Sequence, residues 1–427
     1  MKKVLIITYY WPPSGGSGVQ RWLKFVKYLR DFGWEPIVYT PENPENPETD
    51  ISLQKDIPQN ITILKTPIWE PYSFYKKFTG KKKSQRINAG FLSENKKPNL
   101  LENFSIWIRG NFFIPDARKF WIKPSVKFLE KYLSKNPVDV VISTGPPHSM
   151  HIIAYHLKKK LNIKWIADFR DPWTNIDFYN ELRLSSWADK KHHNLEQKVL
   201  YNADKVIVIS KTMSEDMKRL HKRHYDVITN GFDNDDLQTT DIHLDKKFSI
   251  AHIGTMPKTR NPEALWKVLY VLVKENYQFA SDLEIKLVGR VDYTVIQMLK
   301  QYNLLNYLNK IEYLPHDKVI NIQQQSQILL LLLNDTPNAK MILTGKFFEY
   351  LSAQRPILCI GPTDGDAAKI LNETKSGYIS DFKDEEKLKN NILELYSKYK
   401  DGISLFESTG IQKYSRKNLT RELAELM

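Results

Sequence analysis

Short apolar runs alternate with amphipathic stretches along most of the chain. In its first half, seven apolar runs have the length and residue types of strands. They are Val4–Thr8, Pro36–Thr40, Ile61–Lys65, Val138–Ser143, Lys164–Asp168, Lys205–Ile209 and Asp226–Thr229. Helical patterns lie between several of them, at Val19–Phe32, Ser125–Leu133, His148–Leu161 and Ser186–Tyr201. Continuous apolar strands separated by helices predict a parallel sheet that is covered on both faces.

A polar segment, residues 229–247, interrupts this alternation with turn-forming residues. After this segment, further strands are predicted at Ser249–Ile253, Glu284–Val288, Lys310–Tyr313, Ile328–Leu333 and Pro356–Ile360. Helices are predicted at Pro262–Glu275, Gly345–Ala353, Glu385–Tyr399 and near Ser415–Leu426. Since 427 residues exceed one ordinary core, we expect an α/β protein with two Rossmann-like, doubly wound domains. The expected domains are residues 1–235 and 236–405, with a tail helix in 406–427 and a partly irregular, basic insertion at about 50–124.

Composition argues against several classes of protein. No apolar stretch approaches the roughly 20 residues that span a bilayer, and the N-terminus lacks the apolar core and cleavage site of a signal peptide. The single cysteine, Cys359, cannot form an internal disulfide. We therefore expect a reduced, cytoplasmic setting.

Positive charge is concentrated in one window. The formal net charge is +14, and residues 76–135 contain 15 Lys or Arg against four Asp or Glu. Trp107, Phe112 and Phe113 lie in the same window. Basic clusters with Trp and Phe can bind a nucleic acid or the anionic face of a membrane. A solvated basic surface around ordinary core aromatics is the simpler interpretation.

A glycine-rich loop follows the first predicted strand. Gly16 and Gly18 allow the backbone to approach a ligand closely, and Arg21 lies one turn into the next helix. The dinucleotide fingerprint does not fit, because Arg21 stands where its third glycine should be and the second strand ends without an acidic residue. A Walker-type loop is excluded too, because no Gly-Lys-Ser/Thr follows. The loop therefore predicts close approach of a ligand, without identifying it.

The strongest candidate site begins at Thr344. Thr344 can cap a helix whose first turn contains Gly345 and Lys346, and free N–H groups, a hydroxyl and an ammonium together suit a diphosphate. Glu349 lies one turn further on the same face, where its carboxylate can accept hydrogen bonds from a ribose. The alternative is an amphipathic helix with Lys346 and Glu349 solvated.

Two further loops contribute glycines and cations to the same predicted sheet edge. One contains Gly254, Lys258 and Arg260, and the other contains Gly289 and Arg290. Ligands of open α/β sheets bind beyond the carboxyl ends of the strands, and all three loops lie there.

Together these motifs resemble family-4-type glycosyltransferases of the GT-B fold. The matching stretches, in chain order, are VLIITYYWPPSGGSGVQRWLKFVKYLRDFGWEPIVYT, VITNGFD, HIGTMPKTRNPEAL, LVGR and KFFEYLSAQRPIL. The resemblance implies two Rossmann-like domains facing a cleft, with a UDP- or GDP-linked sugar on the C-terminal domain and the acceptor on the N-terminal domain. It also implies a tail helix that crosses back to the first domain, retention of anomeric configuration, and no metal or cofactor. One departure is Met341, which stands where the family has the first of two glutamates, while Glu349 matches the second.

Candidate chemistry follows from this resemblance. Lys258, Arg260, Lys346 and the helix end at Thr344 could stabilise a departing diphosphate without metal. His148, placed at a helix start by Gly145-Pro146-Pro147, could orient an acceptor hydroxyl or a donor phosphate. Asp168, Arg170 and Asp171 crowd a strand end, where they form either a buried structural ion pair or a carboxylate site for the acceptor. The strings Asp233-Asn-Asp235 and Asp364-Gly-Asp366 are interpreted as turns.

The predicted function is transfer of a sugar from a nucleotide sugar to a saccharide or lipid-linked saccharide, in cell-surface polysaccharide synthesis. Gly18, Arg21, Arg170 and Trp107 are the expected acceptor-side residues, and His148, Asp168, Asp171 and Lys258 the catalytic candidates. The basic window would dock on an anionic membrane, with the enzyme peripheral on its inner face. The alternatives are a nucleotide-sugar isomerase or epimerase of the same fold, and a non-enzymatic nucleic-acid-binding protein. The latter leaves the donor-side loops unexplained.

Overall fold

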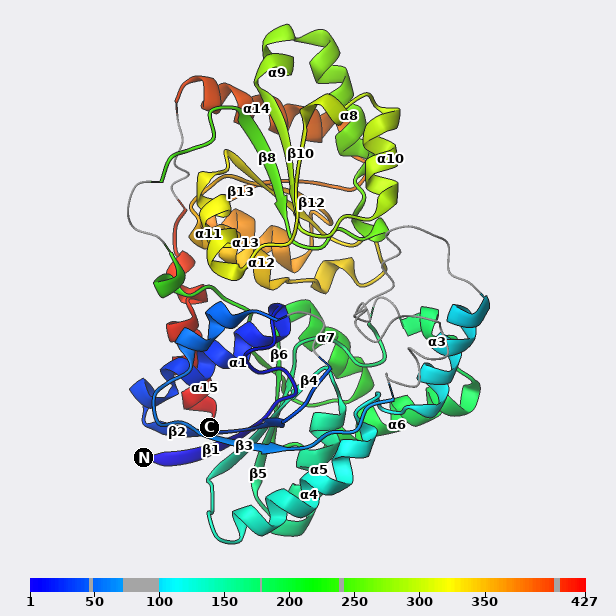
Figure 1. Ribbon diagram of the computed structural model, residues 1–427, viewed down its shortest axis with the longest axis vertical. Coiled ribbons are helices and arrows are strands. Elements are labelled where there is room, and N and C mark those ends of the chain that lie inside the picture. Colours follow the sequence, from blue (N-terminus) through cyan, green and yellow to red (C-terminus); the bar gives the residue numbers. More distant parts are fainter. Residues whose placement is uncertain (46–48, 72–99, 177–178, 238–241, 403–407) are drawn as a thin grey trace. The chain divides into compact units, whose positions relative to one another are not determined.

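The computed structural model describes residues 1–45, 49–71, 100–176, 179–237, 242–402 and 408–427. These residues form two compact units (Figure 1). Unit 1 extends to Thr229 and includes the last segment of the chain, Lys417–Met427, whereas unit 2 is Asn230–Arg416. Each unit is a parallel sheet covered by helices, so the predicted α/β architecture with two doubly wound sheets is confirmed.

Unit 1 contains a seven-stranded sheet with the order β3-β2-β1-β4-β5-β6-β7. The strands are β1 (Lys2–Ile7), β2 (Trp34–Pro41), β3 (Thr62–Thr66), β4 (Val140–Gly145), β5 (Lys164–Phe169), β6 (Lys205–Val208) and β7 (Asp226–Val227). Strand β1 pairs in parallel with β2 from Lys2↔Trp34 and with β4 from Val4↔Val140. The chain reverses its direction of winding between β1 and β4, and ligands of doubly wound sheets bind at such a point.

Helices cover both faces of this sheet. They are α1 (Ser17–Tyr28), α3 (Leu100–Phe112), α4 (Lys119–Leu133), α5 (Ser149–Leu161), α6 (Ser186–Asn202), α7 (Lys211–Leu220) and α15 (Arg416–Leu426). One core contains Val4 and Ile6 of β1, Trp22 of α1, and Leu419 and Leu423 of α15. The last helix of the chain therefore completes the core of the first unit.

Unit 2 contains a six-stranded parallel sheet with the order β10-β9-β8-β11-β12-β13. The strands are β8 (Phe248–Ile253), β9 (Leu283–Val288), β10 (Leu308–Ile311), β11 (Ile328–Leu332), β12 (Ile357–Ile360) and β13 (Gly377–Ser380). The helices are α8 (Glu263–Glu275), α9 (Tyr277–Asp282), α10 (Tyr293–Gln301), α11 (His316–Gln325), α12 (Gly345–Ser352), α13 (Asp366–Thr374) and α14 (Glu385–Lys400). Winding reverses between β8 and β11, which places the expected ligand edge at the ends of these two strands.

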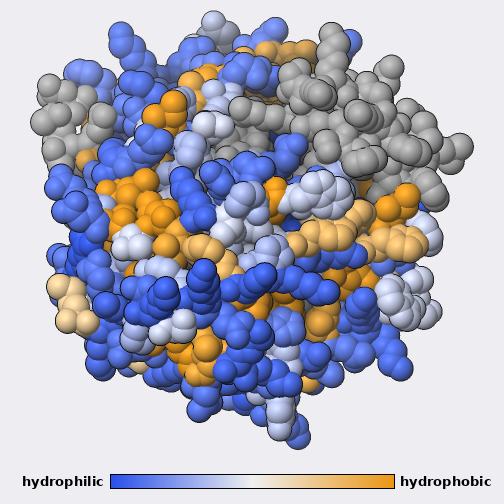
Figure 2. Space-filling model, turned by 60° about the horizontal axis from the view of Figure 1, so that its bottom comes forward, coloured by the Kyte–Doolittle hydropathy of each residue, from blue (hydrophilic) through white to orange (hydrophobic). Residues whose placement is uncertain are grey.

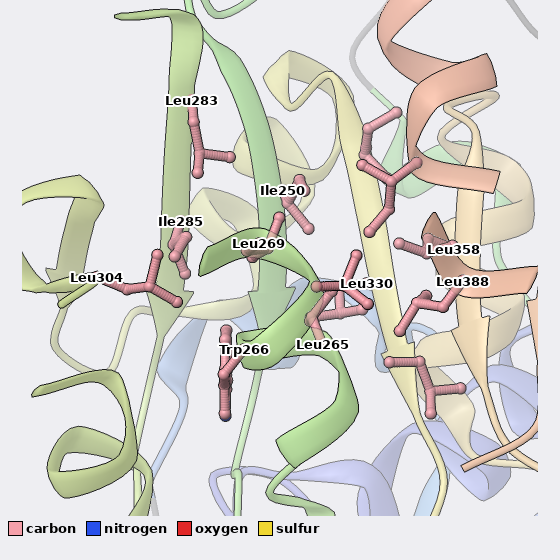
Figure 3. Close-up of a cluster of buried hydrophobic side chains, with 14 of the residues drawn as sticks. Ile250, Leu265, Trp266, Leu269, Leu283, Ile285, Leu304, Leu330, Leu358 and Leu388 are labelled. Atoms are coloured by element: carbon pink, nitrogen blue, oxygen red, sulfur yellow. The ribbon is translucent and has the colours of Figure 1, made fainter. Parts of the chain in front are cut away.

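The core of unit 2 has a layer on each face of the sheet, because successive strand residues point to opposite sides. On one face, Leu265, Trp266 and Leu269 of α8 pack against Ile250 and Leu330 (Figure 3). The opposite face buries the single cysteine and the apolar side of α12, and its cluster includes Ala251, Leu329, Leu331, Phe347, Phe348, Leu351 and Cys359. Residues buried on both faces explain why these strands are apolar throughout.

Each predicted strand is present, with ends within two residues of the expected ones, and β13 is an additional strand. The stretch expected to be partly irregular contains α3 and the start of α4. Pro124 lies inside α4, a position where proline normally disfavours helix. Helix α4 nevertheless begins at Lys119, because Trp121 is buried, stacks on Tyr39 with ring centroids 4.8 Å apart and donates a hydrogen bond of 2.9 Å to Thr66 Oγ1.

Candidate functional site

Two glycines build the ligand edge of the unit 2 sheet. Gly254 follows β8 with φ +109°, and Gly289 follows β9 with φ +104°. The Gly254 N–H donates to Val288 O at 2.8 Å, and the Gly289 N–H donates to Ile311 O at 2.8 Å. A Cβ on Gly289 would lie 3.2 Å from the carbonyl oxygen of Gly254. The two loops therefore pack backbone against backbone, and positive φ favours glycine at both positions.

Lys346 extends from the first turn of α12 to the loop after β8. A Cβ on Gly254 would lie 3.0 Å from Lys346 Nζ and 3.4 Å from its Cε, so the lysine fills the space that glycine leaves. Burial, together with the nearby Arg260 cation, lowers the pKa of Lys346 to about 7, while Glu349 opposes this shift. The protein thus places too little negative charge near the Lys346 ammonium to balance its burial, which suits an anionic ligand.

His252 is the neighbour of Lys346 that sequence reasoning missed. The imidazole is fully buried on β8, with Nδ1 3.0 Å from Leu330 O and Nε2 3.4 Å from Lys346 Nζ. Burial and the Lys346 cation hold the pKa of His252 well below its ordinary value. A signal was present in the sequence, because a histidine in a strand buried along its whole length needs polar partners.

Arg260 and Lys258 lie in a short 3-10 turn, Lys258–Arg260, after the same strand. Arg260 Nε donates to Asn334 Oδ1 at 2.6 Å, and its Nη1 donates to Thr255 O at 3.4 Å. The guanidinium is therefore held in place, whereas Lys258 is exposed. Arg290 contributes backbone to the same region, since its carbonyl accepts from the Met256 N–H at 2.8 Å.

Helix α12 begins as predicted, with Thr344 at its N-cap and Gly345 as its first residue. Thr344 does not cap the helix through its side chain. Its Oγ1 is buried and, among the residues that the structure describes, has no hydrogen-bond partner. A Cβ on Gly345 would meet nothing within 4 Å. The start of α12 thus combines an unused hydroxyl, open space and the free N–H groups of a helix N-terminus.

Glu349 lies one turn beyond Lys346 on α12. Its Oε2 accepts a hydrogen bond of 3.1 Å from Nε2 of Gln323, a residue of α11 that is almost completely buried. This contact fixes the carboxylate and leaves its other oxygen available. The structure thus brings together Gly254, Gly289, Arg260 and Lys346, with Glu349 on the same helix as the lysine.

The glycine loop of unit 1 packs against Arg170. Gly16 has φ +91° and precedes α1, and a Cβ there would meet nothing within 4 Å. A Cβ on Gly18 would lie 3.0 Å from Tyr10 Cδ2 and 3.2 Å from Arg170 Nη1. Arg170 donates to the carbonyl oxygens of Gly18, at 3.4 Å, and Pro146. The space beside Gly18 is therefore filled by Tyr10 and Arg170 of the protein itself, whereas the space beside Gly16 is open to a ligand.

Asp168 forms a buried ion pair, but its partner is Arg21 of α1, which was expected on the acceptor side, and not the neighbouring Arg170. Arg21 Nη2 lies 2.8 Å from Asp168 Oδ1, and Trp22 Nε1 and Thr144 Oγ1 donate to Oδ2 at 2.7 and 2.9 Å. Burial raises the pKa of Asp168, but Arg21 and these donors outweigh it, so its pKa is lowered. The Asp168 carboxylate has every oxygen engaged by the protein, which fits a structural role.

Asp171 lies next to Arg170, partly buried. Burial lowers the pKa of Arg170, and the Asp171 carboxylate opposes this shift. Of the two candidate carboxylates at this strand end, Asp171 is therefore the more accessible to a ligand.

His148 lies at the N-cap of α5 and stacks on Trp173, with ring centroids 4.4 Å apart. It is 7% exposed, and its buried Nδ1 has no hydrogen-bond partner within the described parts of the chain. Burial lowers the pKa of His148 well below its ordinary value. The helix N-terminus behind it is already occupied, because Asp116 accepts from Ser149 N and Oγ at 2.8 Å each. His148 is thus a neutral imidazole that could orient a ligand.

Exposed and half-buried tryptophans and phenylalanines lie on unit 1. We define the aromatic surface as Trp69, Trp107, Phe112, Phe113, Phe120 and Trp187 together with Lys119 and Lys191. Trp69 packs edge-on to Phe120 with centroids 4.8 Å apart, and Trp107 packs edge-on to Phe112 at 5.7 Å. Lys119 Nζ lies over the rings of Phe113 and Phe120. Figure 2 shows apolar side chains reaching the surface between hydrophilic ones on one face of the molecule.

The aromatic surface is held by the fold. Asn111 at the end of α3 donates to Trp107 O at 2.8 Å and to Arg183 O at 3.2 Å, and the Ser185 N–H donates back to Asn111 Oδ1 at 2.7 Å. Helix α3 is thereby fixed to the segment before α6. Part of the basic window that suggested a docking surface, residues 76–99, lies outside the described residues.

Both Asp-x-Asp strings form turns. Asp233 caps a 3-10 turn, Asn234–Asp236, by accepting from the Asp235 N–H at 3.2 Å. Asp364 pairs with Lys340 on the surface, and Asp366 is the first residue of α13.

The sequence model of glycosyltransferase family 4 matches residues 16–236, slightly more than half of the chain. The chain belongs to this family. No curated protein matches it in sequence. Family-4 glycosyltransferases are enzymes, so the predicted glycosyltransferase class is confirmed, and with it the predicted resemblance.

Solved structures show the GT-B fold expected of the family. Sucrose-phosphate synthase (tll1590) from Thermosynechococcus elongatus is 13% identical with a TM-score of 0.64, and the match covers 100% of this chain and 98% of that one. HepE (Alr3699) of Anabaena, in complex with UDP and glucose, is 12% identical with a TM-score of 0.62, covering 100% and 99%. A Listeria monocytogenes protein described as a UDP-N-acetylglucosamine 2-epimerase is 12% identical with a TM-score of 0.55, covering 99% and 94%. At these identities the likeness concerns the fold alone.

Proposed function

We propose that unit 2 binds the diphosphate of a nucleotide sugar at the start of α12, and that the enzyme transfers the sugar to a saccharide or lipid-linked saccharide. The observation that carries this proposal is the packing of Lys346 against Gly254. It brings the N-terminus of α12, the ammonium and the Arg260 cation to one loop at the carboxyl edge of the sheet. The unused Thr344 hydroxyl adds a hydrogen-bond donor at the same helix start.

The chemistry follows from where charge develops. Breaking the bond between sugar and diphosphate leaves negative charge on the departing phosphate, and preorganised cations and N–H groups stabilise that charge. Lys346, Arg260 and the exposed Lys258 are positioned on this edge, so the reaction needs no metal ion in this proposal. Glu349 would accept hydrogen bonds from the ribose, as the family resemblance implies. HepE binds UDP, which makes UDP the first nucleotide to test, followed by GDP.

We assign the acceptor to the carboxyl edge of unit 1. The open Gly16 turn, the accessible Asp171 carboxylate and the neutral His148 lie on loops after β1, β5 and β4. Asp171 would direct the acceptor hydroxyl, and His148 would donate or accept a hydrogen bond at a sugar. Arg170 supports this edge by bracing the Gly18 loop. We also propose that the reaction retains anomeric configuration, because the family resemblance implies it.

The aromatic surface would place the enzyme on an anionic bilayer. Trp69 is 53%, Phe112 58% and Trp187 62% exposed, which is unusual for such side chains. Trp and Phe favour the bilayer interface, and Lys119 and Lys191 add attraction to anionic lipids. In the part of the chain that the structure describes, no helix could cross a membrane, so attachment would be peripheral. This arrangement suits a lipid-linked acceptor in cell-surface polysaccharide synthesis.

An isomerase or epimerase of nucleotide sugars is the second candidate, favoured by the Listeria neighbour of the same fold. Such an enzyme would convert the nucleotide sugar with no acceptor present. A transferase would release nucleoside diphosphate only when an acceptor, or water at a slow rate, takes the sugar. We propose no nucleic-acid partner, because nucleic-acid binding does not require the loops around Lys346.

The test is a calorimetric titration of UDP and GDP into wild type and into Lys346→Met. We expect one nucleotide to bind wild type, and the variant to lose at least about tenfold in affinity, because a charge-assisted contact is removed. Lys340→Met is the matched control, since Lys340 is an exposed lysine paired with Asp364 on the surface. Equal binding by wild type and Lys346→Met would place the diphosphate elsewhere.

A further inference from the structure

His252 connects three elements around the proposed diphosphate site. It lies on β8, its Nδ1 is 3.0 Å from the carbonyl oxygen of Leu330 on β11, and its Nε2 is 3.4 Å from Nζ of Lys346 on α12. The side chain is fully buried. A buried imidazole in a strand is costly unless both ring nitrogens are satisfied.

Three groups face the imidazole: Leu330 O, Lys346 Nζ and the backbone of Thr255. A carbonyl oxygen can only accept a hydrogen bond, so Nδ1 carries the proton and donates to Leu330 O. A neutral imidazole then has a lone pair on Nε2, directed at a group that can only donate. Lys346 therefore donates to His252, and this contact favours the protonated form of the lysine.

Packing alone does not require this arrangement. An apolar side chain would fill the same position between β8 and β11, and a shorter amide could make the contact to Leu330 O. Only the second ring nitrogen reaches Lys346. The same lysine also packs against Gly254, where a Cβ would lie 3.0 Å from Nζ.

We propose that His252 is a positioning residue, whose neutral Nε2 accepts a hydrogen bond from Lys346 and holds the ammonium over Gly254 before the nucleotide sugar binds. This inference rests on the proposed function, because it assigns His252 a role at the same diphosphate site. His252 acts through Lys346 and does not itself contact the ligand in this proposal. It supplies a fixed acceptor without adding a negative charge that would repel the diphosphate.

The charged groups around Lys346 set the expected pH dependence. Arg260, from the loop after β8, favours the neutral amine, and Glu349, from α12, favours the cation. His252 is neutral and acts through its hydrogen bond. Loss of that bond should make the lysine easier to deprotonate, so the pH at which nucleotide affinity begins to fall should decrease.

A pair of variants separates positioning from packing. His252→Asn keeps a donor for Leu330 O but removes the acceptor for Lys346, whereas the amide oxygen of His252→Gln can reach the position of Nε2. We expect His252→Asn to bind UDP or GDP about tenfold more weakly than wild type at pH 7, with its affinity midpoint shifted to lower pH. His252→Gln should recover most of the lost affinity, and its midpoint should lie close to that of wild type.

The controls distinguish the inference from the proposed function. Thermal unfolding of both variants checks that the fold is retained, and Lys346→Met reports whether the diphosphate site is correctly placed. The inference is overturned if His252→Asn keeps the wild-type affinity and midpoint while Lys346→Met loses binding. It is also overturned if His252→Asn and His252→Gln lose affinity equally and both keep the wild-type midpoint. If Lys346→Met binds like wild type, the proposed function fails before the role of His252 arises.

Discussion

Arg21 Nη2 lies 2.8 Å from Asp168 Oδ1, and both side chains are at most 1% exposed. The two residues are far apart in sequence, one on α1 and one at the end of β5, so the ion pair links the first crossover helix to the centre of the unit 1 sheet. Arg21 also donates to Thr229 O at 2.7 Å and Ile228 O at 3.0 Å. A single guanidinium thus joins α1, β5 and the last segment of the unit before the chain enters unit 2.

Removal of Asp168 should destabilise unit 1. Asp168→Ala leaves a buried guanidinium without its counter-ion, and we expect the free energy of unfolding to fall by about 3–5 kcal/mol in urea denaturation. Asp31→Ala is the control, because Asp31 pairs with Lys417 at an exposed site and should change stability by less than about 1 kcal/mol. The pKa of Asp168 is lowered in the folded state, so its stabilisation is present above the unfolded pKa of about 3.9 and is lost as pH falls through the folded value. Similar losses in both variants would contradict a special role for the buried pair.

Substitution of Gly254 should displace Lys346, whereas substitution of Gly345 should not. Gly254→Ala introduces a Cβ at positive φ and 3.0 Å from Lys346 Nζ, so the lysine must move. We expect about a tenfold or greater loss of nucleotide affinity, together with about 1–2 kcal/mol of backbone strain. Gly345→Ala places its Cβ in open space within a helix and should keep the fold. Calorimetric titration and thermal unfolding measure the two effects, and equal affinity for wild type and Gly254→Ala would remove the close approach from the site.

Nucleotide binding should take up a proton above neutral pH. The pKa of Lys346 is about 7 in the free protein because of burial and Arg260, and a bound diphosphate raises it. As pH rises through 7, more of the free protein carries the neutral amine, which must be protonated before it pairs with the ligand. Affinity should therefore fall with rising pH, and titrations at about pH 8 in buffers of different ionisation enthalpy should show uptake approaching one proton. A buffer-independent enthalpy would contradict this, and Lys346→Met should show none of the effect.

Binding to anionic vesicles should depend on the aromatic surface. The triple variant Trp107→Ser, Phe112→Ser and Phe120→Ser should float with phosphatidylserine-containing vesicles several-fold less than wild type, because it removes apolar area that would enter the interface. Tyr277→Ser is the control, since Tyr277 is a 90% exposed aromatic residue of unit 2. Thermal unfolding reports whether the triple variant is folded. Undiminished flotation of a folded triple variant would leave the membrane proposal without support.

The strands could be predicted because burial on both faces makes their pattern continuous. Val4, Ile6 and Val140 are fully or almost fully buried, and a short, continuous apolar run is typical of a strand that is buried on both faces. Helix α3 and the first part of α4 could not be predicted in the same way. The decisive contacts of Trp121, with Tyr39 and Thr66, come from strands far away in the sequence, and Pro124 argues locally against the helix that those contacts stabilise.

The candidate site likewise has features that the local sequence predicts and contacts that only the fold reveals. Gly254 and Gly289 could be located from strand ends, because glycine at such a turn is a local signal. The partner of Lys346 is His252, and their contact spans 94 residues of sequence, so only the fold reveals it. Arg21 and Asp168 are similar, since a conspicuous arginine near a glycine loop looks like a ligand contact until its buried partner is known.

The position of α15 has a consequence for biosynthesis. Leu419 and Leu423 belong to the core that contains β1 and α1, yet the whole of unit 2 is translated before them. A nascent chain stalled after Thr229 would therefore expose the apolar side chains that this helix covers. The unit that leaves the ribosome first is therefore the one whose core is completed last.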